Sequence, residues 1–181
     1  PDPRLELGYL HSAMDLADCE DRLNGPSFVR ASSLRMIAEQ GKQPYTDLIR
    51  GPTSLGALME ARGFPSTPSP RMPVPTEPYF RGGYTISRHC NAEQHIAGLQ
   101  IEANRPRLRD TADNRLRFSR ALVDALKPFL ACHLGLEIGG GKTPAAGWPC
   151  YSLRQVPPHI DAKSAASPAT PQNAPPCQPQ P

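Results

Sequence analysis

The clearest alternation of apolar and polar positions lies between residues 96 and 104. The odd positions are apolar and the even positions from 100 onward are polar, which sets Ala97, Leu99, Ile101 and Ala103 against Gln100, Glu102 and Asn104. A period of two predicts a strand that buries one face and presents two amides and a carboxylate on the other. An equally good interpretation is that the polar face is the solvent-exposed side of an ordinary antiparallel strand.

A second strand is predicted for Tyr79 to Arg88. On that reading one side carries Phe80, Tyr84, Ile86 and Arg88. The Gly82-Gly83 pair inside the run indicates a bulge or a close approach of another backbone. If the two strands are neighbours, a phenol and a cation lie beside the Glu102 carboxylate.

The N-terminal third of the chain predicts short elements. Leu5 to Leu10 reads as a strand, and the acidic stretch Asp15 to Asp21 reads as a solvated loop. Leu34 to Gln40 reads as a helix that follows the cap candidate Ser33 and ends at Gly41.

Two further helices are predicted from apolar spacing of three and four. One begins after Thr53 or Ser54, with an apolar stripe made of Leu55, Leu58 and Met59. The other begins after Asp113, with a stripe made of Phe118, Leu122, Ala125, Leu126 and Phe129. Pro128 should kink or end the second helix.

Two other segments are rich in proline. Residues 64 to 78 are proline-rich and predict an extended, semi-rigid connector. Residues 137 to 181 predict a proline-rich disordered tail. The run Gly139 to Thr143 resembles a phosphate-binding loop but lacks a glycine at the required distance from its lysine.

Composition narrows the function classes. The chain has 181 residues, of which 23 are proline and 6% are aromatic, with a mean hydropathy of −0.48. No apolar run approaches the roughly 20 residues that span a membrane, so no membrane role is predicted. A net charge of +3 is too small to argue for nucleic acid, and the arginine-rich segment 105 to 120 is expected to be a solvated face. Five cysteines without paired spacing suit a reducing, cytoplasmic location.

Five segments, in order, resemble the C-terminal half of the N-formylglutamate amidohydrolase family. They are LELGYL at residues 5 to 10, LIRGPTSLGALME at 48 to 60, YFRGGYTISRHC at 79 to 90, LQIEANR at 99 to 105 and RDTADNRLRF at 109 to 118. The resemblance covers about residues 4 to 134. It implies an α/β fold of the zinc-carboxypeptidase-like (phosphorylase/hydrolase-like) kind, a mixed sheet flanked by helices, with residues 1 to 136 as its C-terminal part.

The resemblance also implies an activity, which is zinc-dependent hydrolysis of the amide bond of an N-acyl amino acid. Glu102 in LQIE matches the family's catalytic glutamate and is the candidate general acid and base. Arg88 is the candidate anchor for a substrate carboxylate, and Tyr84 is a candidate hydrogen-bond donor to substrate. Gln100 and Asn104 are expected to orient the substrate. A salt bridge from Arg88 to Glu102 is the alternative role for that arginine.

The chain departs from the family in one respect that bears on activity. The family's zinc ligands belong to the N-terminal half of its domain, and none matches here, so no metal ligand is predicted. His11, His89 and His95 lack partners at ligand spacing. We therefore expect a domain that is incomplete on its N-terminal side and inactive without the metal-binding half. The alternative is a noncatalytic remnant that binds a partner protein or an acidic metabolite through Arg88 and the arginine-rich segment.

Overall fold

The computed structural model describes residues 5–41 and 43–138 and is a mixed α/β arrangement. Three short strands form one sheet in the order β2-β1-β3. β1 (Leu5–Gly8) lies in the centre, parallel to β2 (Ser66–Thr67) and antiparallel to β3 (Gln100–Ala103). The two strand predictions are confirmed in part: β1 covers the first four residues of the predicted 5 to 10, and β3 covers residues 100 to 103 of the predicted 96 to 104.

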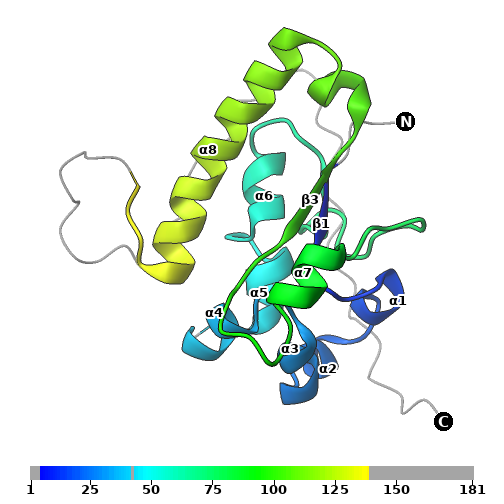
Figure 1. Cartoon of the computed structure of the whole chain (residues 1–181), viewed down its shortest axis with the longest axis vertical. Helices are drawn as coiled ribbons and strands as arrows, with labels where there is room; N and C mark the ends of the chain where they lie inside the picture. The colour runs from blue at the N-terminus through cyan, green and yellow to red at the C-terminus, as the bar shows by residue number, and fades with distance from the viewer. Residues whose placement is uncertain (1–4, 42, 139–181) are drawn as a thin grey trace, which may run out of the picture.

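Helices make up most of the rest of the described chain. In order they are α1 (Ala13–Leu16), α2 (Glu20–Leu23), α3 (Pro26–Ala31), α4 (Arg35–Gln40), α5 (Tyr45–Arg50), α6 (Leu55–Glu60), α7 (Tyr84–His89), the short η1 (Arg105–Arg109) and α8 (Ala112–Leu134). Figure 1 shows α6 and α8 side by side on one side of the sheet, with α1, α2 and α3 grouped at one end. None of the described helices is long and apolar enough to cross a membrane.

The core lies between one face of the sheet and the helices that cover it. Leu5 and Leu7 of β1 are almost fully buried, and Ile101 and Ala103 of β3 pack against the same cluster. The helices contribute Leu48, Ile49, Leu55, Met59, Ala121, Ala125 and Phe129. This face is the apolar side that the alternation predicts.

The helix predictions based on apolar spacing are confirmed. α6 is capped by Ser54, whose hydroxyl accepts from the Ala57 N–H at 3.2 Å. α4 ends at Gly41 as expected, but it begins at Arg35 after Leu34, and Ser33 does not cap it. α8 carries the predicted stripe, but Thr111 rather than Asp113 caps it, through a bond from the Asn114 N–H at 3.1 Å.

Two predictions about the backbone are wrong. Residues 79 to 88 do not form a strand: the chain is extended only up to Gly83 and then turns into α7, whose buried residue Ile86 lies four positions before buried Cys90. The stretch 15 to 21 is not a plain loop either, because it includes parts of α1 and α2. Ser12 and Asp15 form a capping box that starts α1, which a Ser-x-x-Asp pattern can signal.

Pro128 neither ends α8 nor breaks it, since the helix runs on to Leu134. Residues 64 to 78 form no helix and contribute only the two-residue edge strand β2, in keeping with a connector. The glycine-rich run at 139 to 143 and most of the predicted tail lie outside the described residues.

Candidate functional site

The polar face of the sheet brings Glu102 next to a second carboxylate. Glu6 on β1 pairs directly with Glu102 on β3, so their side chains project to the same face with Cβ atoms roughly 5 Å apart. Both residues are half-buried. Like charges directly opposite each other do not stabilise a sheet, so sheet pairing alone does not account for this choice of residues.

Glu102 is held by Gln100 from the same face of β3. The Gln100 Nε2 donates to Glu102 Oε1 at 2.9 Å, and Gln100 Oε1 accepts from the Gly83 N–H at 3.4 Å. Glu6 is oriented in a similar way, because its Oε2 accepts from the Phe80 N–H at 3.0 Å. The segment that leads into α7 therefore borders both carboxylates.

Gly8 allows that segment to lie against β1. It pairs with Gln100, and a Cβ built on it would lie 2.5 Å from the Arg81 carbonyl carbon. The Leu10 N–H also donates to Arg81 O at 2.8 Å. A backbone does approach closely here, but the glycine that admits it is Gly8 and not the predicted Gly82-Gly83 pair, at which a Cβ would meet only side chains.

Gly8→Ala is expected to push residues 81 to 83 away from the sheet. The clash is with backbone, so we expect a loss of about 1–3 kcal/mol in the free energy of unfolding, measured by urea denaturation. Gly83→Ala is the matched control, because its Cβ would meet only ordinary contacts at 3.5 Å or more and its φ of −90° suits alanine. Equal stability of the two variants would contradict the packing described here.

The structure brings together only part of the predicted site. Gln100 and Glu102 share the polar face, whereas Asn104 is exposed and lies beyond the strand, immediately before η1. Tyr84 is 79% exposed at the start of α7, and Arg88 is exposed in its last turn. Tyr84 and Arg88 lie away from the polar face because they belong to a helix, whose side chains do not alternate between two faces as those of a strand do.

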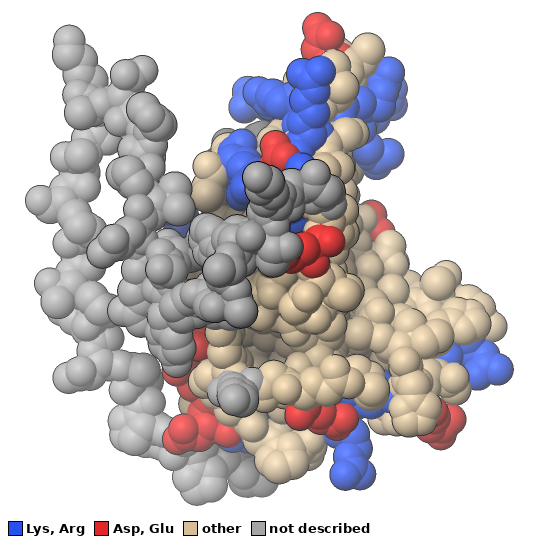
Figure 2. All heavy atoms as spheres, turned by 90° about the vertical axis from the view of Figure 1, so that its left-hand side faces the viewer, with Lys and Arg blue, Asp and Glu red and all other residues tan. Residues whose placement is uncertain are grey.

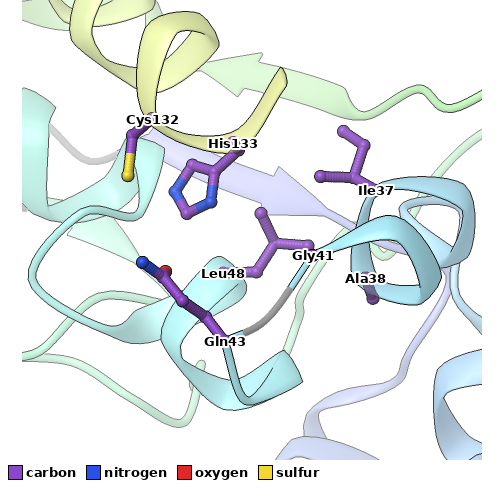
Figure 3. Close-up of a pocket in the computed structure, with 7 residues that line it drawn as sticks. All are labelled: Ile37, Ala38, Gly41, Gln43, Leu48, Cys132 and His133. Atoms are coloured by element: carbon purple, nitrogen blue, oxygen red, sulfur yellow. The ribbon is translucent and has the colours of Figure 1, made fainter. Parts of the chain in front are cut away.

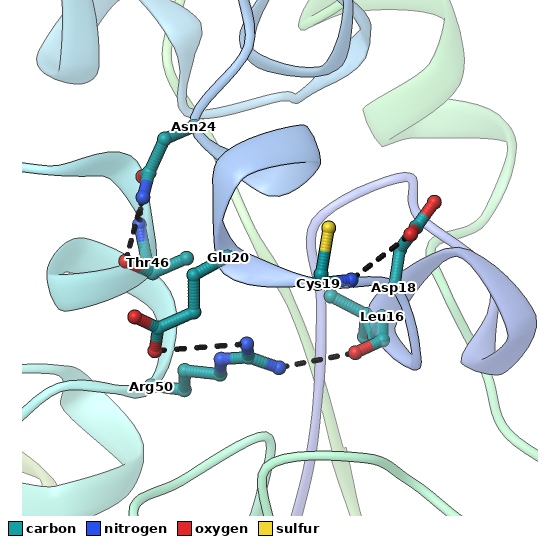
Figure 4. Close-up of polar contacts among 7 residues, drawn as sticks. All are labelled: Leu16, Asp18, Cys19, Glu20, Asn24, Thr46 and Arg50. Carbon is teal, nitrogen blue, oxygen red and sulfur yellow. Dashed lines mark hydrogen bonds and ion pairs between the residues drawn. The ribbon is translucent and has the colours of Figure 1, made fainter. Parts of the chain in front are cut away.

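Arg88 does not form the ion pair with Glu102 that was its alternative role. No ion pair joins Arg88 to Glu102 or to another carboxylate of residues 5–41 and 43–138. Its guanidinium is thus available on the surface of α7. Arg50, by contrast, is anchored: it donates to Leu16 O at 3.0 Å and lies 4.0 Å from Glu20, as Figure 4 shows.

Tyr79 anchors the segment that borders the two carboxylates. Its hydroxyl donates to Leu7 O at 2.7 Å, across β1 from the carboxylates. Burial, followed by the charges of Glu6 and Glu77, raises the pKa of this phenol above its ordinary value. Tyr79 therefore stays protonated as a donor and fixes the segment that carries Phe80.

Of the histidines singled out by spacing, only His11 is buried. His89 and His95 are exposed. The His11 ring stacks on Phe28 with centroids 4.4 Å apart and meets Tyr45 edge-on at 5.7 Å. Burial lowers its pKa to about 4, opposed by the Asp15 charge, so the imidazole is neutral near pH 7. In the structure it packs as an aromatic ring against Phe28 and Tyr45.

The described residues do not provide a zinc site. Among them no group of three or more histidine, cysteine, aspartate or glutamate side chains is arranged to hold a metal ion. Glu6 and Glu102 supply two carboxylates, whereas a catalytic zinc takes three protein ligands that usually include histidine. The donors present thus do not fit zinc by themselves.

A separate cavity lies among α4, α5 and the C-terminal end of α8. It has a volume of about 230 Å³ and is lined by Ile37, Ala38, Gly41, Gln43, Leu48, Cys132 and His133 (Figure 3). His133 Nε2 lies 3.1 Å from Thr53 O, and desolvation lowers the pKa of its ring, which favours a neutral donor. The lining includes none of the polar-face residues, so we do not assign the cavity to the Glu102 site.

The cysteines differ from the prediction. Cys19 and Cys132 each take part in a disulfide bond, and Cys90 is a free, buried thiol. Disulfides are typical of oxidising compartments. The structure thus lends no support to a fully reduced set of cysteines.

No family model, no curated protein and no solved structure matches the chain.

Proposed function

We propose that this chain is the glutamate-bearing C-terminal part of an amide hydrolase similar to the N-formylglutamate amidohydrolases, with the zinc-carboxypeptidase-like fold that this implies. Its substrate is an N-acyl amino acid. The observation that carries the proposal is the position of Glu102, held by Gln100 on a half-open polar face opposite Glu6.

Amide hydrolysis needs a group that takes a proton from water and returns it to the leaving nitrogen. Glu102 has this role in the proposal, because its second oxygen is not engaged by Gln100 in the described chain. Gln100 fixes the carboxylate, and Gly83 fixes Gln100 in turn. This chain of bonds is the kind of support that keeps a catalytic group in one rotamer.

Substrate recognition falls to α7 in this proposal. The exposed Arg88 offers a planar fork suited to a carboxylate, and the Tyr84 hydroxyl offers a donor one helical turn earlier. Asn104 lies beyond β3 and orients substrate only from the edge of the site. No step is assigned to zinc, because the donors described here do not fit it.

The test is release of formate from N-formyl-L-glutamate by two proteins: this chain, and a form extended upstream in its coding sequence and supplied with zinc. We expect turnover only from the extended form. Absence of hydrolysis by that form, with N-acetyl amino acids also tried, would overturn the proposal.

A second candidate is a noncatalytic chain that binds an acidic metabolite or a partner through Arg88. The observation that favours it is the lack of a metal-binding group among the described residues. It predicts saturable binding of glutamate derivatives by this chain alone, lost in Arg88→Ala. A cytoplasmic location accompanies both candidates as a prediction, and the disulfide-bonded state of Cys19 and Cys132 weighs against it.

A further inference from the structure

Six arginines gather at one end of the molecule, on η1 and the first half of α8. We call them the arginine surface: Arg105, Arg107, Arg109, Arg115, Arg117 and Arg120, all exposed. Figure 2 shows the basic side chains concentrated at the top of the molecule. With only Asp110 and Asp113 to offset them, this segment carries four net positive charges, more than the +3 of the whole chain.

The nearby carboxylates do not neutralise the arginine surface. Asp110 is used locally: it accepts from the Arg107 N–H and the Thr111 N–H, each at 3.0 Å, and from Asn114 Nδ2 at 2.7 Å. Within the part of the chain that the structure describes, none of the six guanidinium groups forms an ion pair. The positive charge therefore faces outward.

Three of the guanidinium groups are held in place without a counter-ion. Arg109 Nε donates to Ala103 O at 2.7 Å, and Arg115 Nη1 donates to Arg109 O at 3.1 Å. Arg117 lies over the Phe64 ring, 5.4 Å from its centroid. Groups held in advance lose less conformational freedom when they bind an anion.

We propose that the arginine surface docks an acidic segment of a partner protein. Arginine forks match carboxylates in two-point hydrogen bonds. The apolar side chains Leu116 and Val123, each 51% exposed, stand on α8 beside them. Arginine is enriched at protein interfaces, and the two aliphatic side chains add apolar surface that a partner can cover.

The same surface is a poor match for single-stranded nucleic acid. Base stacking requires exposed aromatic rings, and the two rings nearest the arginines are engaged: Phe64 is buried, and Phe118 packs on it edge-on with centroids 5.7 Å apart. The proposal does not depend on the activity proposed for Glu102, because none of the six arginines has a role in it.

The test measures binding of the full chain to a short fluorescent peptide of Glu-Glu-Leu repeats at physiological salt. The variant Arg105→Glu/Arg120→Glu changes two arginines whose side chains make no hydrogen bond in the described chain, so the fold should persist. The control Arg30→Glu/Arg71→Glu makes the same change in charge at two exposed arginines elsewhere. We expect the first variant to weaken binding by at least about tenfold and the control by less than about twofold.

Equal losses in the two variants would overturn the proposal, because they would indicate attraction to net charge alone. Absence of saturable peptide binding by the unaltered chain would also overturn it. So would binding of oligouridine, or of phosphatidylserine vesicles, that is tighter than peptide binding and is lost in the first variant. Circular dichroism of both variants shows whether they remain folded.

Discussion

Glu102→Gln is expected to lower kcat/KM of the upstream-extended, zinc-supplied protein by about 10²- to 10⁴-fold, the usual contribution of a general acid-base group. Glutamine keeps the size of the side chain and can still bond to Gln100, but it cannot take a proton from water. The loss should appear in kcat more than in KM, because the substrate contacts assigned to Arg88 remain.

Two variants give this prediction its controls. Glu6→Gln removes the neighbouring charge without touching the proposed proton carrier, so it should reduce the rate less than Glu102→Gln does. Arg88→Lys should raise KM with a smaller effect on kcat, since lysine lacks the planar fork. If Glu102→Gln retains the full rate, the role assigned to this glutamate is wrong.

Acidification is expected to destabilise the folded chain through His11. The pKa of this buried ring is about 4, below the ordinary value of 6.5. Between these values the unfolded chain binds more protons than the folded chain, so stability falls as the pH drops from about 6.5 to 4. The loss through His11 should reach about 3 kcal/mol at pH 4 and grow no further below it.

Urea denaturation at several pH values, compared between the unaltered chain and His11→Leu, isolates this contribution. Leucine keeps the apolar contacts with Phe28 and Tyr45 but does not titrate, so the stability of the unaltered chain relative to His11→Leu should fall by about 3 kcal/mol on going from pH 7 to pH 4. His133, whose pKa is also lowered by burial, adds a slope of the same sign to both proteins. Exposed His95→Gln is the control, and parallel curves for His11→Leu would refute the assignment.

Local pattern was enough to predict the elements whose faces are set by burial. β1, β3, α4, α6 and α8 all follow from alternation, from spacing of three and four, or from a terminal glycine or serine. The Tyr79 to Arg88 run was misassigned because, over so few residues, its apolar positions fit a period of two as well as they fit a short helix whose one buried residue is Ile86. The spacing of Ile86 and Cys90 is the signal that favours the helix.

The site was predictable only in part. Gln100 and Glu102 lie on one strand, so their common face follows from a period of two. Glu6 was missed because its position opposite Glu102 is fixed by the register between strands far apart in sequence. Gly8 was missed for the same reason, because the segment that passes over it comes from residues 81 to 83.

The central claim is that Glu102 belongs to one part of a metal-dependent amide hydrolase. Zinc content after dialysis, measured by elemental analysis on this chain and on the upstream-extended form, tests it most directly. We expect about one zinc per chain in the extended form, as a single catalytic site requires, and none in this chain alone. No zinc in either form would contradict it and leave binding through Arg88 as the function to pursue.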